Sequence, residues 1–199
     1  MSSLENNSRL FSFVYEVLHY NETHSIPTRH FNLGGTMRFP QLAICAGLIL
    51  WLHADPSLAI ERSDAKTAVA LMQNAQAYLQ KNGVEKALIE FNRLDSPFNS
   101  KSAINPHGDL YLYTLDPKGY QTVHGKNPKI RGKYMLEMRD IDGVYLIQAL
   151  VKICFSSKEG KGWTKYRWPN PITKEVEPKQ GYVERVPGMD LCIGTGIYQ

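Results

Sequence analysis

The chain has 199 residues, of which 43% are hydrophobic and 21% charged, and a formal net charge of +4. This balance is ordinary for a soluble globular protein and argues against wholesale disorder. Lys and Arg are spread along the sequence and interspersed with Asp and Glu. A dedicated nucleic-acid-binding protein instead concentrates its basic residues on one face or helix. The composition therefore argues against nucleic acid as a partner.

A pattern typical of a secretory leader begins at Met37. Met37 and Arg38 are followed by an apolar run at residues 39–53 and by the small-residue sequence ADPSLA, so cleavage is expected after Ala59. The run is shorter than the roughly 20 residues of a membrane-spanning helix. We expect residues 37–59 to act as a signal peptide that sends the protein to the periplasm or outside a bacterial cell. The alternative is an uncleaved anchor in the inner membrane, formed by residues 39–53.

Residues 1–36, which precede this leader, are polar and hold three of the six histidines. The spacing of these histidines fits no metal-ligand pattern. The sequence NLGGT just before Met37 is consistent with a ribosome-binding site read in frame. We therefore expect translation to begin at Met37, residues 1–36 to be a mis-assigned extension, and residues 60–199 to form one domain.

The first elements of the expected domain are two helices. Asp64 is a favourable N-cap for a segment whose apolar residues recur with helical spacing, at positions 65, 68, 69, 72, 75 and 79. Gly83 is typical of a helix end, and VEKALIEFNRL predicts a second, shorter helix. The Ser/Asn/Pro-rich segment 95–108 is expected to be a loop.

From Asp109 the pattern changes to that of strands. DLYLYTLD and YQTVHG, joined by the turn sequence DPKG, predict a hairpin rich in aromatic and β-branched residues. In its first strand Tyr111 and Tyr113 share one face, and Leu110 and Leu112 share the other.

The second half of the domain is predicted to hold one helix and three strands. The apolar spacing in residues 144–155 predicts the helix, with Asp142 as its N-cap. Asp140 and Asp142 also resemble the start of a calcium loop, but the further oxygen ligands of an EF-hand are missing. Strands are predicted in WTKYRW, VEPKQGYVERV and LCIGTGIY. Two helices, then about five sequential strands with a central helix, indicate an α+β domain with an antiparallel sheet.

Cys154 and Cys192 are the two cysteines of the expected mature domain. An oxidising compartment permits a disulfide between them. Both also lie in apolar surroundings, so buried free thiols are the alternative.

Several separated sequences are similar to a known family. GDLYLYTLDPKGYQTVHGKNPKIRGK, GKGWTKYRWPNPITKEVEPKQGYVERVPG and IGTGIY resemble, in order and spacing, the type 2 single-Cache domain, the extracytoplasmic sensor module of chemoreceptors and sensor kinases. The sequence AYLQKNGVEKALIEFN is similar to the family's long first helix. The resemblance runs from about Ala65 to Tyr198.

The resemblance implies a PAS-like five-stranded antiparallel sheet. The long N-terminal helix would cover one face, and a central helix and loop would cover the face that binds ligand. Relatives often bind short carboxylates such as acetate, propionate, lactate or pyruvate, so a small organic anion is the expected partner. Signalling relatives continue into a membrane helix and an output domain after the position of Tyr198, whereas this chain stops at Gln199. We therefore expect a stand-alone exported sensor that acts through a membrane-bound receptor or sensor kinase. It would contact a membrane itself only if its N-terminal segment stays uncleaved.

Candidate ligand residues follow from strand alternation and from this resemblance. Alternation places Tyr166 and Trp168 on one face of their strand, and Lys165 and Arg167, expected to be solvated, on the other. Tyr166 is expected to form an aromatic wall and to donate a hydroxyl hydrogen bond. For Trp168, pocket and core are equal alternatives.

The other candidates lie on neighbouring strands. The resemblance puts Lys179 and Tyr182 beside the same cavity, where the lysine would neutralise a bound anion and the tyrosine would donate a hydrogen bond. The alternative for Lys179 is an ordinary surface position. His124 either hydrogen-bonds the ligand or caps a loop, and Tyr113 is a further candidate for the pocket wall.

The sequence offers no motif for catalysis. It contains no nucleophile–base set, paired-carboxylate site, zinc spacing or phosphate-cradling glycine loop. No cofactor is therefore predicted, and the protein is not expected to be an enzyme. The alternative functions are an extracytoplasmic enzyme accessory and a protein-interaction domain with no ligand.

Overall fold

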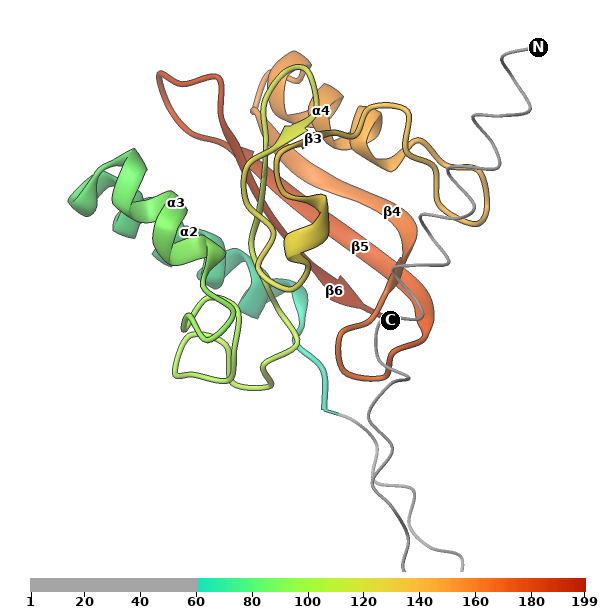
Figure 1. The fold of residues 1–199 in the computed structure, drawn as a ribbon, viewed down its shortest axis with the longest axis horizontal. Helices are drawn as coiled ribbons and strands as arrows, with labels where there is room; N and C mark the ends of the chain where they lie inside the picture. Colours follow the sequence, from blue (N-terminus) through green and yellow to red (C-terminus); the bar gives the residue numbers. More distant parts are fainter. Residues whose placement is uncertain (1–60) are drawn as a thin grey trace, which may run out of the picture.

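The computed structural model describes residues 61–199 (Figure 1). The leader and extension predicted within residues 1–59 therefore lie outside the described residues. Between residues 61 and 199, no helix is long and apolar enough to cross a membrane. The helices are α2 (Ala65–Asn82), α3 (Val84–Asn92), the short 3-10 helix η1 (Pro128–Ile130) and α4 (Leu146–Ser156); the strands are β1 (Tyr113–Leu115), β2 (Tyr120–Gln121), β3 (Lys133–Tyr134), β4 (Lys161–Pro169), β5 (Val176–Arg185) and β6 (Cys192–Tyr198).

The main sheet has four antiparallel strands in the order β1-β6-β5-β4. The α+β antiparallel class is confirmed, although the strand count differs from the expected five. The predicted second strand runs beside β1, where the Thr114 amide donates to the Val123 carbonyl at 3.1 Å. Only the Tyr113–His124 pair forms a bridge between the two segments. The first two residues of the predicted strand pair instead with β3 in a separate small sheet. Too few ladder hydrogen bonds remain to make it a fifth strand of the main sheet.

The two faces of the sheet carry separate hydrophobic clusters. Helices α2 and α3 cover one face, where the apolar stripe of α2 packs on β6 and β5. Helix α4 and the loops around η1 and β3 cover the other face (Figure 1). Leu110 and Leu112 belong to the first cluster and Tyr111 and Tyr113 to the second, as predicted from alternation. The predicted ligand face is therefore the face beneath α4.

Both ends of α2 follow from the residues that precede and follow it. The Asp64 carboxylate accepts the Thr67 amide at 2.7 Å, which satisfies one of the free donors of the first turn. Gly83 has a φ of 80°, a conformation that favours glycine, and its amide donates to the Leu79 carbonyl. The predicted helix, its cap and its end are confirmed.

The predicted N-cap of α4 is wrong. Helix α4 begins at Leu146 with Tyr145 in the cap position, which makes no side-chain cap hydrogen bond. The Asp140 carboxylate accepts the Asp142 and Val144 amides and so closes a turn before the helix starts. Such local side-chain to backbone bonds compete with capping. Asp142 is left free to pair with Arg167 at 3.0 Å, and Arg167 is therefore not simply solvated.

Cys154 on α4 and Cys192 on β6 form a disulfide, with both residues buried. Of the two alternatives left open by the sequence, the structure has the bridge. It ties α4, which covers the predicted ligand face, directly to the sheet beneath it.

Candidate functional site: a buried lysine among tyrosines

Strand register places three polar side chains in one row across the face beneath α4, the predicted ligand face. Lys179 of β5 is paired with Tyr166 of β4 on one side and with Tyr198 of β6 on the other. Paired residues project from the same face of an antiparallel sheet. All three side chains are buried, and Lys179 is only 1% exposed.

Glycines in the next row leave room for these side chains. Gly181 of β5 is paired with Gly196 of β6. A Cβ at Gly181 would lie 2.5 Å from the Tyr166 hydroxyl oxygen, and a Cβ at Gly196 would lie 2.6 Å from Lys179 Cε. Any larger residue at these two positions would push the Tyr166 ring or the Lys179 side chain away from the sheet. The two glycines therefore let Tyr166 and Lys179 lie flat against it.

The Lys179 ammonium group has only neutral neighbours. Its Nζ donates to the Tyr111 hydroxyl at 2.7 Å and, more weakly, to the Tyr198 hydroxyl at 3.4 Å. It also lies 4.0 Å from the ring centre of Tyr111 and 4.7 Å from that of Tyr198. Among the residues of the described domain, no carboxylate forms a salt bridge with it. The negative charge of Asp109, which lies outside salt-bridge range, raises the pKa of Lys179 and so offsets part of the effect of burial.

Burial accordingly lowers the pKa of Lys179 well below its ordinary value of 10.5. Desolvation disfavours the charged form, and neutral hydroxyls and rings offset only part of that cost. An anion placed beside Nζ would therefore be favoured on electrostatic grounds.

Tyr111 and Tyr198 extend the lysine's contacts toward the end of β4. Their hydroxyl oxygens lie 3.3 Å apart, and the Tyr198 hydroxyl donates to the Pro169 carbonyl at 2.8 Å. Burial raises the pKa of both phenols well above the ordinary range, so both stay protonated near neutral pH. They are hydroxyl donors that can turn from one another toward a ligand.

His124 lies beside Tyr111, with ring centres 4.8 Å apart. Its Nδ1 accepts the amides of Lys126 at 3.3 Å and Asn127 at 2.9 Å. Burial lowers its pKa well below 6.5, and the charges of Lys179 and Arg131 lower it further. A neutral ring that accepts at Nδ1 carries its proton on Nε2. His124 thus caps a loop with one nitrogen and has a second nitrogen that can donate.

Tyr113 and Tyr166 form the opposite wall of the cluster. Burial raises the pKa of both phenols above the ordinary range. The Tyr113 hydroxyl donates to the Tyr182 carbonyl at 3.3 Å. Tyr113 lies over Gly194, where a Cβ would come within 2.3 Å of its ring.

Tyr182 itself is not part of the cluster. It lies on the face covered by α2, where its ring is 4.8 Å from that of Trp163 and its hydroxyl donates to Glu184 at 3.1 Å. Residues three apart on a strand face opposite sides of the sheet. The expectation that Lys179 and Tyr182 border one cavity is therefore contradicted by the alternation along β5.

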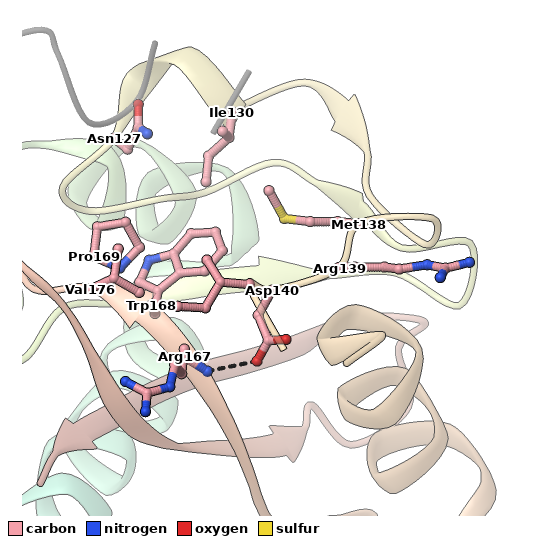
Figure 2. A pocket seen from close by; sticks show the side chains of 10 residues that line it. Asn127, Ile130, Met138, Arg139, Asp140, Arg167, Trp168, Pro169 and Val176 are labelled. Carbon is pink, nitrogen blue, oxygen red and sulfur yellow. Dashed lines mark hydrogen bonds between the residues drawn. The ribbon is translucent and has the colours of Figure 1, made fainter. Parts of the chain in front are cut away.

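Trp168 joins the cluster to a small cavity beside the end of β4. Its indole is half-buried, and its ring centre is 6.4 Å from those of both Tyr166 and His124. It also lines the cavity, whose volume is about 30 Å³ (Figure 2). Lys179 is not a lining residue, so Trp168 is a wall shared by the buried cluster and the cavity.

The structure thus brings together Tyr113, His124, Tyr166, Trp168 and Lys179, five of the predicted site residues, on one face. It adds two residues that the prediction did not choose, Tyr111 and Tyr198. Tyr111 shares the face of Tyr113, and Tyr198 alternates with Gly196 and Gly194. An alternating Gly-x-Gly-x-Tyr pattern in a strand is the sequence signal for side chains lying flat over that strand, and it could have identified Tyr198.

Comparison with known proteins gives one family. A family model described as "Cache domain" matches residues 69–199. The sensor histidine kinase MctS of Rhizobium johnstonii is 29% identical over 90 residues, which are 45% of this chain and 19% of the kinase. The methyl-accepting chemotaxis protein McpP of Pseudomonas putida is 29% identical over 93 residues, which are 46% of this chain and 16% of that protein. The chain therefore spans less than a fifth of the length of each of these curated relatives.

A solved structure agrees with this match. The crystal structure of a methyl-accepting chemotaxis protein from Vibrio parahaemolyticus has a TM-score of 0.52 and 24% identity to this chain. The likeness covers 67% of this chain and 86% of the solved one, and it shows a common fold. The sequence match covers residues 69–199, most of the described domain, the fold agrees with it, and the chain belongs to the Cache-domain family.

Proposed function

We propose that this domain is an extracytoplasmic sensor module that binds a small monocarboxylate at Lys179. The observation that carries the proposal is a fully buried lysine whose neighbours are neutral and whose pKa is lowered by burial. A carboxylate beside Nζ would supply the missing negative charge and form a charge-assisted hydrogen bond. Tyr111, Tyr198 and His124 would donate to the remaining carboxylate lone pairs.

The composition of the site favours one carboxylate rather than two. Lys179 is the one cation of the buried cluster, and the walls around it are rings, hydroxyls and glycines. A second carboxylate would be buried without a partner, at a cost of several kcal/mol. The ligand is therefore a monoanion with a small apolar body.

Two observations support the location and the partner that we propose. The Cys154–Cys192 disulfide is typical of an oxidising compartment such as the periplasm. The similar proteins are a sensor histidine kinase and a chemotaxis protein, so a membrane-bound receptor or kinase of that kind is the proposed signalling partner.

Matched acids and amides test this function. We expect acetate or propionate at about 100 times its dissociation constant to stabilise the protein by about 2.7 kcal/mol, a rise in melting temperature of about 5–10 °C. Acetamide and propionamide have the same shape without the charge and should give no shift. Thermal unfolding of the full chain measures both. Equal shifts with acid and amide, or no shift with any carboxylate, would refute a carboxylate site.

A further inference from the structure

The cavity beside Trp168 has apolar walls. Its side chains include Ile130 above, Met138 beside it, and Trp168, Pro169 and Val176 from the ends of β4 and β5 (Figure 2). A volume of about 30 Å³ holds roughly two water-sized groups. Apolar walls make it a better place for carbon than for water.

The charged residues at its rim are already engaged. Arg167 pairs with Asp142 at 3.0 Å, and its amide donates to the Asp140 carboxylate at 2.8 Å. The Arg139 guanidinium donates to the Tyr145 hydroxyl and lies 4.1 Å from the centre of that ring. No charge at this rim is left to bind a polar ligand group, so the chemistry of the cavity suits an alkyl group.

Two short paths connect the cavity to the buried lysine. Pro169 lines the cavity, its carbonyl accepts the Tyr198 hydroxyl at 2.8 Å, and Tyr198 lies next to Lys179. Trp168 also lines the cavity, and its ring centre lies 6.4 Å from that of His124, which lies beside Tyr111, the closest partner of the lysine. On the first path a single side chain, that of Tyr198, separates the lysine from a residue that lines the cavity.

From this geometry we infer that the cavity receives the alkyl chain of the ligand, so that the preferred ligands are unbranched monocarboxylates longer than acetate. This inference rests on the proposed carboxylate site at Lys179. The carboxylate lies at Nζ, and the chain runs past the half-buried Trp168, whose side chain turns aside to admit it to the cavity. Trp168 and the cavity walls then set the chain length, and Lys179 sets the charge.

A chain-length series with two opposite cavity variants tests the inference. Dissociation constants of acetate, propionate, butyrate, pentanoate and hexanoate are measured by titration calorimetry on the full chain. In the wild type, affinity should rise about fourfold per methylene until the cavity is full. Val176→Phe fills the cavity and should remove that gain while acetate affinity stays within about twofold. Met138→Ala enlarges it and should move the optimum to a longer acid.

Ile172→Phe is the matched control for Val176→Phe. Ile172 lies in the turn between β4 and β5, is 41% exposed and does not line the cavity. The affinity of Ile172→Phe should therefore depend on acid length as that of the wild type does. The inference is overturned if wild-type affinity falls from acetate onward, or if both cavity variants keep the wild-type profile. Either result leaves the carboxylate site intact as long as acetate binds. Failure of every acid to bind would instead overturn the proposed function.

Discussion

Lys179→Met should be more stable than the wild type and at least about 30-fold weaker in carboxylate binding. Methionine matches the volume of the lysine stem and removes a buried ammonium group whose neighbours are neutral. Replacing a buried charge with a packed apolar side chain stabilises proteins by on the order of 1–3 kcal/mol. Loss of the charged partner of a buried carboxylate costs about 2 kcal/mol or more, which is the 30-fold change. Denaturant unfolding and titration with propionate measure the two effects.

The gain in stability should depend on pH in a defined direction. Burial lowers the folded-state pKa of Lys179 below the 10.5 of the unfolded chain, so the unfolded chain binds more protons between the two values. Wild-type stability therefore rises with pH through that window. The advantage of Lys179→Met should be greatest below the folded-state pKa and should shrink as pH approaches 10.5.

Lys165→Met is the control for this variant. Lys165 lies on the same sheet, next to Tyr166 along β4, and is exposed. Its replacement should change neither the free energy of unfolding by more than about 0.5 kcal/mol nor the affinity for propionate. If Lys179→Met is less stable than the wild type and still binds propionate, Lys179 is an ordinary structural residue.

The double variant Cys154→Ala/Cys192→Ala should lose about 4 kcal/mol of stability. The bridge spans a sequence separation of 38 residues, and closing a loop of that length in the unfolded chain accounts for about this amount. Because the bridge ties α4 to β6 over the ligand face, propionate binding should weaken as well. Urea unfolding of the oxidised wild type and of the double variant measures the difference.

Reduced wild-type protein separates the bridge from the packing of the two cysteines. Unfolding it in the presence of a thiol reductant should give nearly the stability of the double variant. Equal stability of oxidised wild type, reduced wild type and double variant would show that the bridge contributes nothing.

Helices and long strands of this domain could be predicted because their signals are local. The stripe of α2, the Asp64 cap and Gly83 define that helix without help from the rest of the chain. The alternation in residues 110–113, which lead into β1, correctly separated Tyr111 and Tyr113 from Leu110 and Leu112. The strand at Tyr120–Gln121 was predicted, but its pairing with β3 was not, because that pairing depends on where a distant loop returns.

The site could be predicted only in part, because it depends on register. The row Tyr166–Lys179–Tyr198 is set by pairing across three strands, which one sequence does not give. Tyr182 was misplaced for a simpler reason: alternation along β5 already puts it opposite Lys179. Asp142 was misassigned because Asp140 closes the preceding turn with its own side chain.

Proton uptake on ligand binding tests the role of Lys179 most directly. A carboxylate beside Nζ raises the pKa of the lysine from its lowered value, so binding must take up protons at pH values between the free and bound pKa. Titration calorimetry with propionate, in buffers of different ionisation enthalpy from pH 6 to 10, measures this uptake. We predict that the wild type takes up protons on binding, and that its affinity falls with rising pH wherever protons are taken up, most steeply where the uptake is greatest. Propionate binding with no proton uptake at any of these pH values would contradict the assignment of Lys179 as the carboxylate partner.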